Sequence, residues 1–239
     1  MLIKDLETLR NADFQSGVTI LVDKPLHWTS FDVVKKQFLF QKYTGIKKLK
    51  VGHSGALDPL ATGLLMIAIG KDTKKLNDLQ NLDKVYSGTL KLGASTVSYD
   101  AEFEPDMFYP TDHFNDELIE KTKLKFIGVI SQRPPVYSAL KIDGKKAYQK
   151  ARQGEDFQMK ERQVEIYNFD ITEINIPDIS FSVHCQKGTY IRSLAHDFGI
   201  ALGSGSYLTS LVREKVGEFY LQDAFGLEEL IKNFSKPEE

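Results

Sequence analysis

The sequence of 239 residues contains a single cysteine and no long apolar segment. Cys185 cannot form a disulfide within the chain, and its isolation excludes a zinc site built from several cysteines. The longest apolar run, LLMIAIG, is too short to cross a bilayer. The opening segment MLIKDLETLRN carries charges every few residues and lacks the apolar stretch of a signal peptide. We therefore expect a protein of the reducing cytoplasm, with no membrane partner.

Several motifs of metal and cofactor chemistry are also missing. The five histidines form neither HxxxH nor HExxH, and His184 and Cys185, as neighbours on a strand, would point to opposite faces. The chain has no GxxxxGK[ST] loop and no GxGxxG after a strand. Ser54 does not lie in a GxSxG elbow, which disfavours a serine hydrolase. We expect no metal and no cofactor.

The chain has little excess charge, with a net charge of −2 that by itself argues mildly against a nucleic-acid partner. Charges of the same sign are nevertheless clustered in separate segments of the sequence. Residues 35–50 contain many lysines and no acid, residues 141–152 are rich in lysine, and acids gather at 100–120 and at the end of the chain. Such runs are commonly solvated faces. The aromatic residues within both basic runs favour a nucleic-acid surface more than charge alone would.

The apolar content of 41% and charged content of 27% are typical of a globular protein. Alternation and apolar runs predict strands, and helical spacing with capping residues predicts helices. The predicted strands are 17–25, 84–95, 162–174 and 179–191, and the predicted helices are 30–43, 116–128 and 192–203, with a short one from 227. Residues 131–160 read as an exposed loop with a helix attached. The economical interpretation is one α+β domain, 1–239, with 131–160 as an excursion.

The segment GHSGALDPLATG, residues 52–63, places a carboxylate before proline in a glycine-rich turn. The proline biases Asp58 to an extended backbone, which suits a side chain that must be aimed as a nucleophile or base. The alternative is a structural Asx turn, which composition alone favours. Arg192 could orient the carboxylate by a bidentate bond, or could form a surface salt bridge. Tyr86 and Tyr190 could be core rings or platforms for an extruded base.

GHSGALDPLATGLL closely resembles the GHxGxLDPxAxGxL motif of the TruB-type tRNA pseudouridine synthases. Four further segments resemble that family in its own order, and together they cover residues 17–217. They are VDKPLHWTSFDVV, DKVYSGTLKLG, PPVYSALKIDGKKAYQKARQG and KGTYIRSLAHDFG. One glycine-rich motif would be weak evidence, whereas five in order are specific. The resemblance implies an isomerase that converts uridine to pseudouridine at position 55 of the tRNA T-loop, after flipping the base out.

The resemblance also implies roles for individual residues. Asp58 would be the catalytic aspartate and Arg192 its ion-pair partner, while Tyr86 would stack on the flipped base and assist proton transfer. Tyr190 would line the pocket, Leu211 would close it, and His53 would fill the space left by the flipped nucleotide. Lys24 and Pro25 would shape the floor of the site. The RNA-gripping loop is expected at 131–160, with Lys141, Lys145, Lys146 and Arg152 as its cations. The implied partner is the tRNA T-arm, bound by a monomer.

The implied fold is a pseudouridine synthase catalytic fold: a central, mostly antiparallel mixed sheet flanked by helices, with the inserted RNA-binding thumb loop. The sequence departs from the family pattern at His27, which replaces a glycine, at Ser54, where threonine is commoner, and at Val97, which replaces an acid. No C-terminal PUA domain is expected, since about 20 residues follow Gly217. The alternatives are a module that binds and refolds tRNA without turnover, and a serine or metal hydrolase.

Overall fold

The computed structural model describes residues 1–235, without the side chains of residues 37 and 38. The chain forms two compact units. Unit 1 combines Met1–Tyr86 with the C-terminal part from Val212, and unit 2 is Ser87–Leu211. Strands β5 (Lys84–Leu92) and β13 (Ser206–Val216) contribute residues to both units. Residues 236–239 of the predicted C-terminal segment lie outside the described residues.

The sheet of unit 1 is built around β2 (Val18–Lys24), which confirms the strand predicted at 17–25. Strand β2 pairs in parallel with β1 (Leu2–Ile3) and β15 (Phe225–Gly226), and antiparallel with β4 (Ala61–Ile69). The short strand β3 (Val51–His53) adds to β4, and the order along the sheet is β1-β2-β4-β13. Residues 18–22 and 63–69 are buried without alternation, because apolar side chains cover both faces of these strands.

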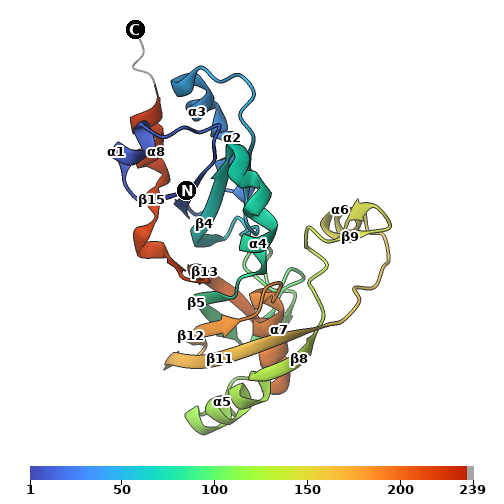
Figure 1. Ribbon diagram of the computed structural model, residues 1–239. Helices are drawn as coiled ribbons and strands as arrows, with labels where there is room; N and C mark the ends of the chain where they lie inside the picture. Colours follow the sequence, from blue (N-terminus) through green and yellow to red (C-terminus); the bar gives the residue numbers. More distant parts are fainter. Residues whose placement is uncertain (236–239) are drawn as a thin grey trace. The chain divides into compact units, whose positions relative to one another are not determined.

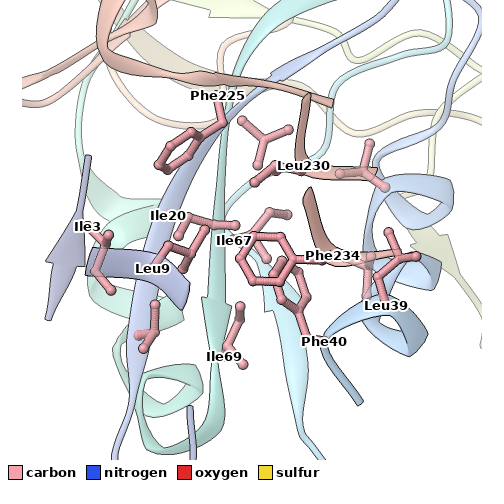
Figure 2. Packing of buried hydrophobic residues seen from close by; sticks show 14 of the residues in the cluster. Ile3, Leu9, Ile20, Leu39, Phe40, Ile67, Ile69, Phe225, Leu230 and Phe234 are labelled. Carbon is pink, nitrogen blue, oxygen red and sulfur yellow. The ribbon is translucent and has the colours of Figure 1, made fainter. Parts of the chain in front are cut away.

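Helices cover one face of this sheet and enclose the main core of unit 1. These helices are α1 (Leu6–Arg10), α2 (Ser30–Lys35), α3 (Gln37–Thr44) and α8 (Leu227–Phe234). Figure 2 shows Phe40 and Phe234 together over Ile67 and Ile69, and the two ring centroids are 5.0 Å apart. A smaller cluster around Leu21, Leu64, Met66 and Val216 covers the other face.

The helix predicted at 30–43 is two helices that meet at Lys36. Thr29 caps α2, because its hydroxyl accepts from Asp32 N at 3.0 Å and the Asp32 carboxylate accepts from Thr29 N at 3.1 Å. Gly45, in the left-handed conformation at φ 73°, ends α3. The chain then passes through β3 and β4 to a 3₁₀ helix, η1 (Gly70–Lys75), and α4 (Leu76–Asn81).

The sheet of unit 2 has the order β13-β5-β12-β11-β8. Strands β11 (Arg162–Asn175) and β12 (Asp178–Cys185) form a long antiparallel hairpin, and β8 (Gly128–Gln132) pairs with β11. Helix α7 (Ile191–Ala201) packs Phe198 against Phe126 and Phe169, and α5 (Asp116–Lys123) lies next to it (Figure 1). The mixed, largely antiparallel sheet flanked by helices confirms the predicted fold class.

Two predicted boundaries in unit 2 were wrong. The strand predicted at 179–191 ends at Cys185, because a turn at Gly188, with φ 81°, leads into α7. The helix predicted at 116–128 ends at Lys123 and continues as a short 3₁₀ helix, η2 (Leu124–Phe126).

Residues 131 and 132 end β8, and the chain then leaves the sheet of unit 2 as an excursion until β11 begins at Arg162 (Figure 1). It contains the hairpin strands β9 (Lys141–Ile142) and β10 (Lys145–Lys146), followed by α6 (Ala147–Arg152). Asp143 and Gly144 both have positive φ, as a two-residue Asp-Gly hairpin turn requires. The remaining short elements are β6 (Ala94–Ser95), β7 (Met107–Phe108), β14 (Phe219–Tyr220) and η3 (Leu221–Asp223). No helix within residues 1–235 has the length and hydropathy needed to span a membrane.

Candidate functional site

Asp58 lies in unit 1, half-buried in the loop that joins β3 to β4. Ala61 N donates to Asp58 O at 3.0 Å, which closes a tight turn with Pro59 after the aspartate. The carbonyl oxygen of Pro59 accepts from His27 N at 2.7 Å. His27, the residue that replaces the family glycine, adopts φ 65° at this contact. The backbone on both sides of the Asp58 carboxylate is therefore held in one conformation.

Ser30, at the start of α2, holds the residue that precedes Asp58. Its hydroxyl accepts from Leu57 N at 2.8 Å and donates to Leu57 O at 3.2 Å. Both Ser30 and Leu57 are buried, and the capping box at Thr29 orients the helix that carries Ser30. This contact between the start of α2 and the Asp58 loop becomes visible only in the folded chain.

Arg213 braces the other side of the same loop. Arg213 is 1% exposed. Nε donates to Leu64 O at 2.7 Å and Nη2 donates to Gly55 O at 3.2 Å. Gly63 has φ 102°, and a Cβ there would meet Arg213 O at 2.5 Å, so this position requires glycine. Sequence reasoning missed Arg213. The available signal was the alternation along LTSLVREKV, which places an arginine two residues after Leu211 on the same side of a strand.

We expect Arg213→Met to lower the free energy of unfolding by about 2–4 kcal/mol, because two buried carbonyl groups lose their donor. Turnover should fall as well, since the loop that carries Asp58 loses a support. Denaturant unfolding and single-turnover assays measure the two effects. Lys215→Met is the matched control on the same strand, because the half-buried Lys215 places its ammonium over the ring of Tyr220, 4.9 Å from the centroid, and not against the Asp58 loop. Equal stabilities of the two variants would contradict the prediction.

Lys24, the last residue of β2, is fully buried. Its ammonium donates to Pro25 O at 2.9 Å and to Trp28 O at 2.6 Å. Burial lowers the pKa of Lys24 to about 8, and the negative charge of Asp58 opposes this shift. Lys24 and Asp58 therefore interact electrostatically. The predicted role of Lys24 and Pro25 in shaping the floor of the site stays a prediction.

His53 ends β3, opposite Ile67 on β4. Burial lowers the pKa of the imidazole, and the neighbouring Arg213 charge adds to the effect. The lowered pKa favours the neutral imidazole, which can fill space without a charge beside the loop. Tyr86 is the last residue of the first segment of unit 1 and is buried on β5.

Arg192 lies in the first turn of α7 in unit 2 and is 4% exposed. Nη1 donates to Ser98 O at 3.2 Å and Nη2 donates to Tyr137 O at 3.0 Å. The carboxylate of Asp100 lies 3.4 Å from Nη1, and both side chains are buried. Ser98 Oγ donates to the second oxygen of Asp100 at 2.6 Å. Asp100, three residues after Val97, is thus the acid of this loop that forms an ion pair with Arg192.

Tyr190 immediately precedes α7, and Gln132 on β8 holds its backbone. Tyr190 N donates to Gln132 Oε1 at 2.8 Å, and Gln132 Nε2 donates to Tyr190 O at 3.0 Å. The guanidinium of Arg162 lies 4.8 Å from the centre of the Tyr190 ring. Leu211 is buried on β13. The predicted pairing of Asp58 with Arg192 joins residues of different units, and it stays a prediction.

The four predicted RNA-contacting cations, Lys141, Lys145, Lys146 and Arg152, are all exposed on the excursion. Two of them form surface ion pairs: Lys145 with Glu155 at 3.0 Å, and Arg152 with Glu102 at 3.1 Å. Lys146 and Arg152 also flank the ring of Tyr148, at 5.6 and 5.8 Å from its centroid. Exposed pairs of this kind are weak and exchangeable, so they leave these cations able to bind phosphates.

Known proteins resemble this chain in sequence and in structure. Residues 41–191 match the model of the TruB family pseudouridylate synthase (N terminal domain). A protein of Flavobacterium johnsoniae named tRNA pseudouridine synthase B is 49% identical over 217 residues, which are 90% of this chain and 95% of that protein. A protein of Phocaeicola vulgatus with the same name is also 49% identical, over 90% of this chain and 92% of its own.

Among solved structures, a chain of a Cbf5-Nop10-Gar1 complex aligns with a TM-score of 0.69 at 28% identity. A chain of an H/ACA RNP bound to a substrate RNA containing 2'-deoxyuridine aligns with a TM-score of 0.66 at 26% identity. The alignments cover 93% and 95% of this chain, and 56% and 55% of the solved chains, so it spans a little over half their length. The family match, the relatives and the motif-bearing loop around Asp58 lead to one conclusion: the chain belongs to the TruB family of pseudouridylate synthases.

Proposed function

We infer that this protein is an enzyme that isomerises uridine to pseudouridine in tRNA, and we propose that its target is the uridine at position 55 of the T-loop. The relatives named tRNA pseudouridine synthase B support the reaction and the substrate, because they match the chain over nine-tenths of its length. The resemblance of five motifs to the TruB-type enzymes supports the T-loop position. The observation that carries the proposal is the Asp58 loop, which Ser30, His27 and Arg213 hold from three sides.

The reaction needs an aimed carboxylate more than it needs a strong acid or base. The N1–C1′ bond of uridine breaks, the uracil turns, and a C5–C1′ bond forms; C5 releases its hydrogen to solvent and N1 gains a proton. Atoms and electrons balance without an added oxidant or reductant. A fixed carboxylate can form a transient covalent bond with the base or the ribose. The braced loop supplies such a group at Asp58.

The other predicted residues have complementary roles in this proposal. Flipping a uridine out of the T-loop costs a few kcal/mol, which stacking on an aromatic ring offsets. We assign this stacking to Tyr86, with Tyr190 and Leu211 lining the pocket, Arg192 orienting the carboxylate, and His53 filling the vacated space. Lys141, Lys145, Lys146 and Arg152 would bind phosphates of the T-arm. We also propose that the protein acts as a monomer in the cytoplasm.

Mapping of pseudouridine in a T-arm transcript incubated with the protein tests this function. Because pseudouridine and uridine have the same mass, the transcript is derivatised chemically before mass spectrometry. We expect one modified position, and no product from a transcript in which that uridine is replaced by cytidine. Modification elsewhere would contradict the proposed position, and tight binding without any product would favour the tRNA-refolding alternative.

The rate of the reaction should fall as the pH rises through about 8. The pKa of Lys24 is lowered to about 8, so its charge is present below that pH and is lost above it. The positive charge attracts the neighbouring Asp58 carboxylate, and its loss should slow turnover about ten-fold, equivalent to roughly 1.4 kcal/mol. Single-turnover rates between pH 6 and 10 measure this fall of the rate on the alkaline side. Lys24→Met should be slow throughout, and an alkaline fall of equal size in that variant would contradict the assignment.

A further inference from the structure

The loop of residues 96–100 holds Arg192 and contains a strained residue. Ser98 accepts a hydrogen bond from Arg192 through its carbonyl oxygen, and Asp100 forms the ion pair. Tyr99 lies between them with φ 65°, a left-handed conformation that is unfavourable for a residue with a Cβ. Such a conformation persists where the surroundings enforce it, and it is common at functional sites.

The side chain of Tyr99 provides the enforcing contact. Its ring stacks on the imidazole of His196, with centroids 3.8 Å apart and planes inclined by 11°. His196 lies on α7 four residues after Arg192, one helical turn along. Its Nδ1 is buried and has no hydrogen-bond partner among the described residues. The stack therefore connects the loop that holds Arg192 with the helix that carries Arg192.

The backbone of the loop is tied to other parts of unit 2. Tyr99 N donates to Thr96 O at 3.2 Å, and Leu208 N on β13 donates to Tyr99 O at 3.0 Å. Thr96 Oγ1 donates to Asp100 O at 2.7 Å. These backbone bonds lead back into the loop or to β13, so the Tyr99 ring is the contact with α7 that the loop makes in addition to those of Arg192. Asp197 and Arg133 influence the Tyr99 hydroxyl through their charges, and burial raises its pKa.

We propose that Tyr99, through its stack on His196, is a positioning residue that fixes the guanidinium of Arg192. The stack sets the distance between the loop and α7. It thereby also sets the positions of Ser98 and Asp100 relative to the Arg192 guanidinium that they contact. This inference rests on the proposed role of Arg192 in orienting the catalytic carboxylate. Small displacements of a positioning group lower turnover strongly while they leave substrate binding unchanged.

The test compares single-turnover rates, followed by tritium release from C5 of uridine, with tRNA affinity from filter binding. We expect Tyr99→Ala and His196→Ala each to slow the reaction about ten-fold, the factor that a lost ring contact accounts for. Affinity for tRNA should stay within about two-fold, because neither residue is assigned an RNA contact. The double variant should be no slower than either single variant, because both remove the same stack. Tyr99→Phe keeps the ring and should restore the rate.

Two further variants separate positioning from folding. Tyr99→Gly removes the ring and relieves the strained backbone, so it should remain folded but stay slow. Tyr167→Ala is the matched control, because Tyr167 contacts His184, at 4.8 Å between centroids, on the β11–β12 hairpin. It should react as fast as the wild type.

Each outcome has one meaning. An inactive wild type would overturn the proposed function itself. If the wild type is active and either Tyr99→Gly or His196→Ala reacts at the wild-type rate, the positioning role is overturned and the proposed function stands. Parallel losses of rate and tRNA affinity in all ring-deleting variants would also overturn it, since they would indicate general structural damage.

Discussion

Asp58→Asn is expected to form no measurable pseudouridine while it binds tRNA about as tightly as the wild type. Asparagine keeps the size of the side chain, so the hydrogen bonds of the loop, which use backbone groups of Asp58 and its neighbours, are preserved. It removes the charge and the nucleophilic oxygen. Loss of a nucleophile lowers turnover by at least about a thousand-fold without a matching loss of affinity.

Tritium release measures the first effect and filter binding the second. Asp78→Asn, the same substitution at an exposed position of α4, is the control and should behave as the wild type. Asp58→Glu keeps the charge but shifts the carboxylate by one methylene, and it should also be strongly impaired. An Asp58→Asn variant with more than about a tenth of wild-type activity would remove Asp58 from the nucleophilic role.

Arg192→Met should cost both activity and stability. Asp100 would remain as an unpaired carboxylate in a buried position, which typically costs about 3–5 kcal/mol of the free energy of unfolding. The carbonyl oxygens of Ser98 and Tyr137 would lose their donors at the same time. Turnover should fall by at least about a hundred-fold if Arg192 orients the catalytic carboxylate.

The double variant Arg192→Met with Asp100→Leu separates these two effects. Replacement of both members of a buried ion pair by apolar side chains is often nearly neutral for stability, so unfolding by denaturant should show a recovery. Activity should not recover, because the arginine is still absent. Recovery of both quantities would show that Arg192 serves the fold and has no direct part in the reaction.

Much of the fold followed from local patterns. The apolar run at 17–25 predicted β2, and alternation predicted β11. The break between α2 and α3 at Lys36 could not be predicted, because the helical spacing continues through it and neither glycine nor proline marks it. The end of β12 at Cys185 was not predicted, because the apolar pattern of a strand continues in the sequence past the turn at Gly188.

The sequence by itself determined the family and the catalytic candidate, because five motifs with fixed residue types occur in one order around Asp58. Tertiary structure alone decided what holds the candidates in place. Arg213 bonds Leu64 across 149 positions of sequence, and Arg192 bonds Ser98 across 94. No local pattern records such contacts, since a buried guanidinium needs acceptors of suitable geometry from whichever segments packing brings near. The loop supports at Ser30 and Arg213, and the Tyr99–His196 stack, therefore emerge only once the chain is folded.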